Sequence, residues 1–209
     1  MSIESVQTLI KDDFTAVNQK ILTALESDVV LINEIGKYIV YSGGKRIRPM
    51  IALLCARAAG YEGDKHITAA ALIEFIHTAT LLHDDVVDHS DMRRGKETAN
   101  EIWGNEAAVL VGDFIYTRSF QMMASLRSMP IMDILSEATN IIAEGEVMQL
   151  LNIGDPDTTE ENYMNVIYSK TAKLFEASGG VAGVIAREAG LPDHVDALSK
   201  YGMYLGTAF

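Results

Sequence analysis

Three aspartates follow a long apolar stretch in the segment Leu81–Asp88, LLHDDVVD. In a helix, Asp84 and Asp88 lie one turn apart on the same face, whereas Asp85 is rotated from them by about 100°. The two carboxylates repel each other, and the dipole at the C-terminal end of a helix also disfavours anions. A bound dication would relieve both penalties. Oxygen ligands favour Mg²⁺, with Mn²⁺ as a substitute, and such a metal shares its shell with substrate phosphates.

The simpler interpretation of this segment is a solvated acidic helix end that binds nothing. His83 also suggests a zinc site, but no second histidine or cysteine stands at ligand spacing. The following residues favour the Mg²⁺ interpretation, because Arg93 and Arg94 come shortly after Asp88. Cations beside a metal-binding acid cluster can bind the other side of a diphosphate, although an isolated pair of arginines is usually a solvated charge run.

A second group of cations lies in the segment Gly43–Pro49, GGKRIRP, at a turn that enters a helix. Helix N-terminal amides attract anions, so Lys45 and Arg48 would complete a cradle for a diphosphate, the alternative being a generic basic loop. The segment is not a P-loop, because the glycine spacing and the terminal Ser or Thr are absent. His77 lies two turns before Asp84 on nearly the same face, as either a core histidine or a ligand contact.

Helices must hold these residues, because apolar side chains recur at spacings of three and four along most of the chain. The sequence predicts helices over residues 3–25, 29–41, 49–60, 64–88, 105–127, 130–153, 159–189 and 198–209. The polar stretch Ser90–Lys96 is predicted to be a loop. No linker divides the chain, so we expect one all-α domain over residues 1–209. The last helix has no stop signal before Phe209, which predicts a C-terminally incomplete domain.

Composition limits the partners of this protein. Hydrophobic residues make up 48% of the chain, and the net charge of −12 argues against nucleic acid. The single cysteine, Cys55, fits a reducing compartment and is predicted to be a core residue. The N-terminus lacks the features of a secretory signal, and no apolar run has the length of a transmembrane segment. We therefore expect a cytoplasmic protein.

Three motifs together resemble the trans-polyprenyl diphosphate synthase family of prenyltransferases. They are GGKRIRP at 43–49, DDVVD at 84–88 with DMRRG at 91–95, and SKTAKLF at 169–175. Each motif alone is moderately specific, whereas all three in this order and spacing are highly specific. The resemblance extends from about residue 34 to the end. It implies an isoprenoid synthase-type helical bundle around a deep central cavity, in a homodimer, with isopentenyl diphosphate and an allylic diphosphate such as farnesyl diphosphate as substrates.

The resemblance also implies roles for the motif residues. Asp84 and Asp88 would ligate Mg²⁺ bound to the allylic diphosphate, with Asp85 in support and Arg93 on the same diphosphate. Lys170 and Thr171 would contact this diphosphate from a facing helix. The isopentenyl diphosphate would be held by Lys45, Arg48, His77 and Arg94. Mg²⁺, Arg93 and Lys170 would stabilise the charge on the departing diphosphate. The isopentenyl double bond would then attack the allylic cation.

The sequence departs from the family in one respect, and two alternative functions remain beside the resemblance. Family members carry a second aspartate-rich motif, usually preceded by Phe-Gln, whereas this sequence stops at Phe209. We therefore expect the 209-residue chain to retain half of the metal site and to be inactive or nearly so. A class I terpene cyclase also uses one acidic motif, but it does not need a second diphosphate cradle. An accessory subunit of a heteromeric prenyl synthase often has degraded acidic motifs, whereas DDVVD is intact.

Residues just before the first acidic motif shape the product cavity in this family, where an aromatic side chain blocks a growing chain early. Here Ala79 and Thr80 occupy those positions, which predicts a long, octaprenyl product for a quinone side chain. Ile76 lies one turn deeper and is predicted to narrow the tunnel. Phe120, Met122 and Met123 on a neighbouring helix are predicted to form its floor, unless they are simply core residues.

Overall fold

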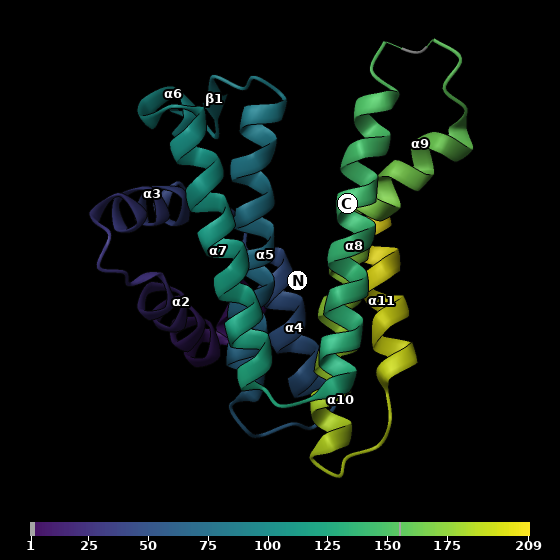
Figure 1. The fold of residues 1–209 in the computed structure, drawn as a ribbon. Coiled ribbons are helices and arrows are strands. Elements are labelled where there is room, and N and C mark those ends of the chain that lie inside the picture. The colour runs from purple at the N-terminus through teal and green to yellow at the C-terminus, as the bar shows by residue number, and fades with distance from the viewer. Residues whose placement is uncertain (1–2, 155) are drawn as a thin grey trace.

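A long central helix, α5 (Lys65–Val87), organises the structure (Figure 1). It packs most extensively against α7 (Asn105–Ser125) and also against α4 (Ile47–Ala58), α2 (Lys11–Leu25) and α10 (Lys173–Glu188). The computed structural model describes residues 3–154 and 156–209. The remaining described helices are α1 (Ile3–Leu9), α3 (Val30–Tyr41), α6 (Ala99–Trp103), α8 (Met129–Leu151), α9 (Glu160–Ile167) and α11 (Val195–Ala208).

The helical content confirms the predicted all-α class. Within residues 3–154 and 156–209, strands are limited to β1 (Met92–Arg93) and β2 (Lys96–Glu97). None of the described helices is both long enough and apolar enough to span a bilayer.

The central position of α5 follows from its sequence. Between Ala69 and Leu82, most residues are apolar and buried, so the helix presents apolar surface on most of its sides. A helix of this kind is stable only when other helices surround it. Cys55 of α4 lies in the same core with 3% exposure, as predicted, and burial raises the pKa of its thiol to about 12.

Helix boundaries follow local signals in the chain. Pro49 stands in the first turn of α4, as predicted, where its missing N–H costs no hydrogen bond. Ser128 begins α8 by accepting a hydrogen bond from the Ile131 amide at 3.3 Å, and Thr159 caps α9 in the same way.

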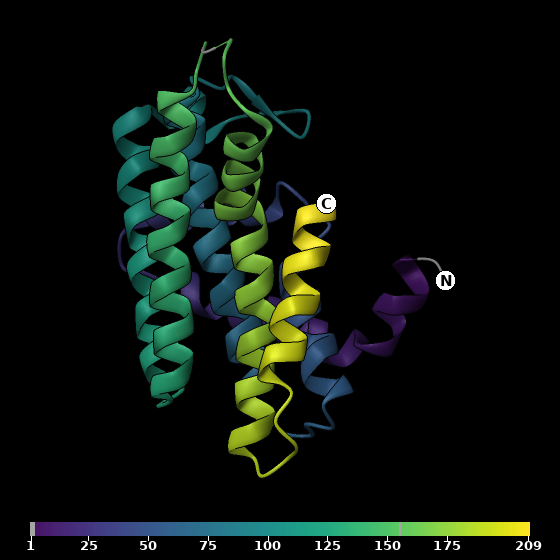
Figure 2. The same ribbon diagram turned by 90° about the vertical axis from the view of Figure 1, so that its right-hand side faces the viewer.

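The predicted helix over 3–25 is divided in two. Ile10 has non-helical backbone angles (φ −121°, ψ 23°), and its side chain stays in the core at 2% exposure. The bend lets α1 point away from the bundle (Figure 2), whereas Ile10 remains buried. The neighbouring Leu9 is 72% exposed as a result.

The predicted loop over 90–96 contains a short hairpin, which the sequence pattern did not reveal. Arg93 pairs with Lys96, and the two residues between them have positive φ angles, 55° at Arg94 and 77° at Gly95. This is the backbone geometry of the tight hairpin turns that match the natural twist of two strands. Glycine reaches it without strain, and the turn fixes the direction in which Arg93 and Arg94 leave the hairpin.

The predicted helix over 159–189 contains a wider π-helical turn at Tyr168–Ala172, between α9 and α10. Such turns are often found at functional sites. Here the turn carries Lys170 and Thr171.

The last helix, α11, does not pack through all of its predicted apolar residues. Tyr201 and Tyr204 are exposed, whereas Gly202 and Gly206 form the close contact with the π-helical turn and α10.

Candidate active site

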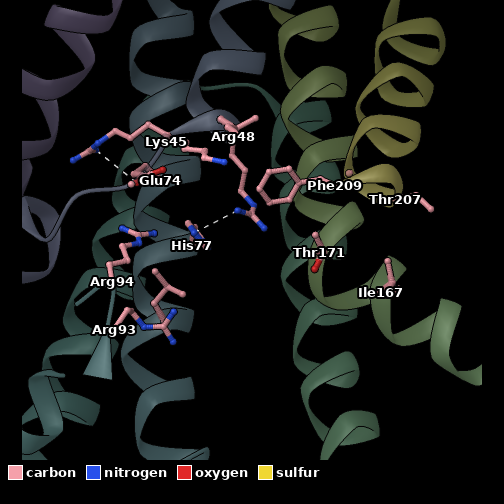
Figure 3. A pocket seen from close by; sticks show the side chains of 15 residues that line it. Lys45, Arg48, Glu74, His77, Arg93, Arg94, Ile167, Thr171, Thr207 and Phe209 are labelled. Carbon is pink, nitrogen blue, oxygen red and sulfur yellow. Dashed lines mark hydrogen bonds and ion pairs between the residues drawn. The ribbon is translucent and has the colours of Figure 1, made fainter. Parts of the chain in front are cut away.

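A cleft with a volume of about 830 Å³ gathers both basic motifs on one side of α5 (Figure 3). We call it the cationic cleft. Its charged lining residues are Lys45, Arg46, Arg48, Glu74, Arg93 and Arg94, and its other lining residues include His77, Leu81, Ile167, Thr171, Thr207 and Phe209. All four residues predicted to hold isopentenyl diphosphate therefore line one cleft, although they come from three separate segments. Five cations against one carboxylate make it strongly positive.

The two basic motifs meet at Gly44. Its φ of 145° is unfavourable for other residues, and a Cβ there would lie 2.6 Å from Nη1 of Arg94. The absence of a side chain thus lets the hairpin arginine pack on the loop that begins α4. In the same loop, Arg46 adopts a left-handed conformation (φ 48°) and donates a hydrogen bond to the Val40 carbonyl at 3.1 Å.

Arg48 is held deep in the cleft between an imidazole and an aromatic ring. Its Nη1 lies 3.4 Å from Nε2 of His77, and its guanidinium carbon lies 4.6 Å from the centre of the Phe175 ring. Burial lowers the pKa of Arg48 to about 10, so it remains charged at neutral pH. Burial and the neighbouring arginines lower the pKa of His77 well below 6.5, so the imidazole is neutral.

Glu74 is the one carboxylate in the cationic cleft among the described residues. Its side chain is 13% exposed, and Oε1 lies 3.7 Å from Nη1 of Arg46. Burial raises the pKa of Glu74, while the charges of Arg46, Arg48 and Arg94 oppose that rise. The sequence analysis missed this residue, although its place one turn before His77 on α5 was a usable signal.

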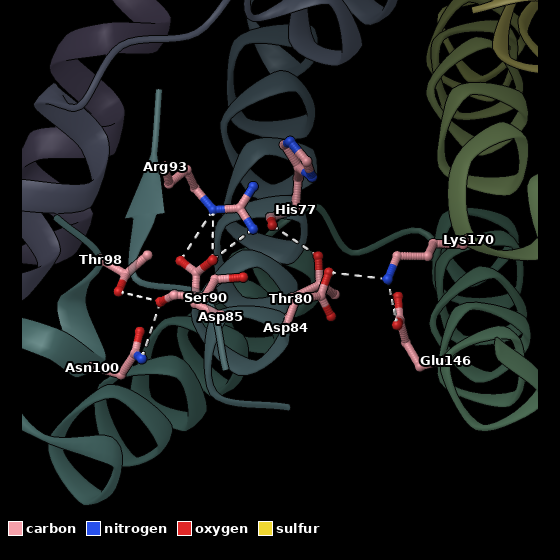
Figure 4. A network of polar contacts seen from close by, with 10 residues as sticks. All are labelled: His77, Thr80, Asp84, Asp85, Ser90, Arg93, Thr98, Asn100, Glu146 and Lys170. Carbon is pink, nitrogen blue, oxygen red and sulfur yellow. Dashed lines mark hydrogen bonds and ion pairs between the residues drawn. The ribbon is translucent and has the colours of Figure 1, made fainter. Parts of the chain in front are cut away.

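The second aspartate of the acidic motif, Asp85, faces the hairpin. It is 1% exposed, and Arg93 binds it through Nη2 at 2.7 Å and Nε at 2.8 Å (Figure 4). The rotation of about 100° from Asp84 explains why Asp85 points away from the expected metal position. It was predicted to support a metal, and its contact in the structure is instead with Arg93, which also lines the cationic cleft.

Asp84 faces α8 and the π-helical turn, away from the hairpin that binds Asp85. Lys170 Nζ lies 3.5 Å from Asp84 Oδ2 and 2.7 Å from Oε2 of Glu146 (Figure 4). Burial, and then the charge of Glu146, raise the pKa of Asp84 to about 6, against the opposing effect of Lys170. Burial alone would lower the pKa of Lys170, but Glu146 and Asp84 raise it.

Asp88 is exposed at the end of α5, and its charge adds to the rise in the pKa of Asp84, so these two carboxylates could share a divalent cation that also binds a ligand. In the described part of the chain, no three His, Cys, Asp or Glu side chains lie close enough to hold a metal alone. Mg²⁺ does not require this, since it commonly takes one or two carboxylates and completes its shell with water and phosphate oxygens. Burial, and then the charge of Glu146, raise the pKa of Asp84 despite Lys170, and a bound cation would favour the charged carboxylate.

A narrower cavity of about 350 Å³ extends from Asp84 between α5, α7 and α8. We call it the apolar channel. Acidic side chains stand at Asp84, Asp113 and Glu146, and most of the wall is apolar. The wall residues include Ile76, Ala79, Thr80, Val87, Tyr116, Thr139, Ile142 and Ala143. An elongated apolar ligand with a charged end suits such a cavity.

The predicted channel residues are only partly brought together. Ile76, Ala79 and Thr80 line the channel, whereas Phe120 is 38% exposed, and Met122 and Met123 are buried in the core.

Tyr116, one turn before Phe120, lines the wall in their place. Its ring packs edge-on against Phe120, with 4.9 Å between the ring centres. No local motif in the sequence marks Tyr116 or Glu146, because each reaches the site only through helix packing.

Comparison with known proteins places the chain among prenyl synthases. The chain is 64% identical to the octaprenyl diphosphate synthase of Escherichia coli over all of its residues, which span 64% of that relative. A decaprenyl diphosphate synthase structure from Rhodobacter capsulatus matches with a TM-score of 0.94 and 46% identity, over 99% of this chain and 63% of that one.

A polyprenyl synthase from Caulobacter crescentus, solved with calcium and isoprenyl diphosphate, matches with a TM-score of 0.93 and 42% identity, over 98% of this chain and 62% of that one. The chain thus spans less than two thirds of the length of each of these relatives. The model of the family described as polyprenyl synthetase matches residues 29–209. On this evidence, the chain belongs to the polyprenyl synthetase family.

Proposed function

We propose that the protein is a trans-polyprenyl diphosphate synthase, which adds isopentenyl diphosphate units to an allylic diphosphate and makes a long-chain product of the octaprenyl class. The observation that carries this proposal is the pair of adjoining sites along α5. The cationic cleft suits one diphosphate, and the acid-rimmed apolar channel suits a second diphosphate with a hydrocarbon tail.

In this proposal the cationic cleft binds isopentenyl diphosphate through Lys45, Arg48 and Arg94, with neutral His77 as a hydrogen-bonding partner. Charge-assisted hydrogen bonds from several arginines suit a diphosphate better than a single lysine would. The cation–π contact with Phe175 and the deep position of Arg48 keep its guanidinium in place before the substrate arrives. The cleft therefore loses little conformational freedom on binding.

Beside this cleft, at the C-terminal end of α5, Asp84 and Asp88 would hold Mg²⁺, or Mn²⁺, together with the allylic diphosphate. The metal would supply positive charge that stabilises a departing diphosphate. Lys170 would contact the same diphosphate from the π-helical turn. Arg93 and Thr171, which line the adjoining cationic cleft, would contact it from the edge of that cleft.

The bond between C1 and the diphosphate oxygen breaks, and both electrons leave with the diphosphate. The isopentenyl double bond then attacks C1 to form the new carbon–carbon bond. A proton is lost to the released diphosphate.

The finer assignments rest on the resemblance and on the relatives. We propose farnesyl diphosphate as the starter, an octaprenyl chain for a quinone side chain as the product, a homodimer as the assembly and the cytoplasm as the location. The E. coli relative is an octaprenyl diphosphate synthase, and the small side chain at Ala79 supports a channel that stays open near the acidic rim.

Incorporation of radiolabelled isopentenyl diphosphate, with Mg²⁺ and farnesyl diphosphate, tests this function. Two proteins are compared: the 209-residue chain, and a chimaera in which the chain is joined to the part of the E. coli relative that the match leaves uncovered. We expect little or no turnover by the 209-residue chain and robust turnover by the chimaera. A chimaera that converts farnesyl diphosphate without consuming isopentenyl diphosphate would instead indicate a terpene cyclase.

A further inference from the structure

Lys170 has two carboxylate neighbours at unequal distances. Its Nζ donates to Oε2 of Glu146 at 2.7 Å, a length typical of a charge-assisted hydrogen bond. The distance to Oδ2 of Asp84 is 3.5 Å, which is an ion pair without a short hydrogen bond. The ammonium group therefore lies beside Asp84 but is held by Glu146 (Figure 4).

The position of Glu146 is fixed by the backbone around it. Its neighbour Gly145 lies so close to the π-helical turn that a Cβ there would come within 2.6 Å of the Ser169 Cβ and 3.2 Å of the Lys170 amide nitrogen. Ser169 itself is 6% exposed. Since neither backbone segment has room to shift toward the other, the spacing between Glu146 and Lys170 is set by helix packing.

A second lysine on the same helical segment shows a different arrangement. Lys173 contacts Glu137 of α8 at 3.2 Å and also Glu176 of its own helix at 3.1 Å. If Glu137 is neutralised, Lys173 keeps Glu176 as a partner. If Glu146 is neutralised, the nearest carboxylate left to Lys170 is Asp84, the candidate metal ligand.

We propose that Glu146 is a positioning residue, which holds Lys170 beside Asp84 and prevents its ammonium group from competing with a divalent cation there. This inference rests on the proposed function. Without Glu146, the ammonium group would close the 3.5 Å gap and form its short hydrogen bond with Asp84. A metal would then have to displace it.

Binding of Mn²⁺ to the 209-residue chain in the presence of inorganic diphosphate, measured by isothermal titration calorimetry, tests this inference. The Glu146→Gln substitution keeps the shape of the side chain and removes its charge. We make it both in the wild-type chain and in a Lys170→Gln chain. Because neighbouring charged groups are energetically coupled, we expect Glu146→Gln to weaken Mn²⁺ binding by about three- to tenfold when Lys170 is present. In the Lys170→Gln chain, the same substitution should have less than about a twofold effect.

Equal weakening in both backgrounds would overturn the inference, because Glu146 would then act on the metal directly. An unchanged affinity in the wild-type background would also overturn it. A wild-type chain that binds no Mn²⁺ with diphosphate would contradict the proposed metal site, and the inference with it. Glu137→Gln serves as the matched control, with unchanged affinity expected. Circular dichroism checks folding, and Glu146→Asp, which shortens the reach of the carboxylate, provides a second variant with a smaller effect in the same direction.

Discussion

The two sides of α5 are built by different means. The cationic cleft takes its charges from two short stretches, 43–49 and 91–95, in which a turn brings cations together within a few residues. The apolar channel takes single residues from α5, α7 and α8, which are distant in the sequence. The cleft should therefore bind its ligand mainly through charge, and the channel should select its ligand mainly through shape. Changes on the two sides should have separable consequences.

Asp84→Asn is expected to have the largest effect. We predict a loss of isopentenyl incorporation by the chimaera of about 10²–10³-fold, the range seen when one group that stabilises transition-state charge is removed. The radiolabel assay with Mg²⁺ and farnesyl diphosphate measures it. Metal-free binding of inorganic diphosphate to the 209-residue chain should be unchanged, since this binding depends on the cationic cleft. If both readouts fell together, the two sides would not be separable.

Arg48→Leu changes the cationic cleft and should have the next largest effect. A hydrogen bond between charged groups contributes about 1.5–3 kcal/mol, so diphosphate affinity should fall roughly 10- to 100-fold. Calorimetry on the 209-residue chain measures this, and in the chimaera the KM for isopentenyl diphosphate should rise more than kcat falls.

Arg118→Leu is the matched control for this prediction. Arg118 also lies over an aromatic ring, at 4.9 Å from the centre of Phe114, but it is not among the residues that line the cleft. Its replacement should leave diphosphate affinity unchanged, and a similar loss in both variants would point to a general charge effect.

The same contrast explains what the sequence could predict. The acid and basic motifs are local, so their spacing marked Asp84, Arg48 and Arg93 as candidates, whereas their roles came from the resemblance. The helical class followed from apolar periodicity. The bend at Ile10, the hairpin turn at Arg94 and the π-helical turn depend on tertiary packing or on a single backbone angle, which a periodic pattern does not contain.

The partners of the motif residues were also hidden from the sequence. The relative positions of packed helices bring three such partners to their sites, namely Glu74, Tyr116 and Glu146. For the same reason the sequence pattern predicts Phe120 as a channel residue, whereas Tyr116 lines the channel in the structure.

Ala79→Tyr should alter the channel without abolishing the reaction. Ala79 has no exposed surface, and a phenol ring there would fill part of a 350 Å³ cavity, which is already near the lower end of the roughly 300–1,000 Å³ range of ligand pockets. We expect the chimaera to release shorter chains, with isopentenyl consumption within a few-fold of the wild-type value. Thin-layer chromatography of the dephosphorylated products measures chain length.

Tyr116→Ala and Phe120→Ala locate the end of the channel in the same assay. Because Tyr116 lines the cavity, its truncation should lengthen the product more than truncation of Phe120. An unchanged distribution of product chain lengths in the Ala79→Tyr variant would contradict the assignment of this cavity to the growing chain.

The smallest effect on either site should come from Asp13→Asn, which acts at the opposite end of α5. Asp13 accepts two hydrogen bonds of 2.7 Å from Arg57, and its Oδ2 lies 3.1 Å from Nε2 of the buried His66. Loss of these interactions should lower the free energy of unfolding by about 1–3 kcal/mol, toward the lower value because Arg57 is 36% exposed. Diphosphate affinity at a temperature where the variant is folded should not change.

The pH dependence of unfolding gives this prediction a sharper form. Burial lowers the pKa of His66 below 6.5, so the unfolded chain binds this proton more readily and stability falls as the pH drops below about 6.5. Arg57 lowers the pKa of Asp13 below 3.8, so the free energy of unfolding falls a second time as the pH drops from about 3.8 to the folded-state pKa of Asp13. The Asp13→Asn variant lacks this second fall in stability. The difference in the free energy of unfolding between the wild-type chain and the variant should therefore shrink below pH 3.8. Urea unfolding followed by circular dichroism measures both curves. A difference that stayed constant with pH would show that the Asp13 charge contributes nothing, and that only the shape of its side chain matters at this end of α5.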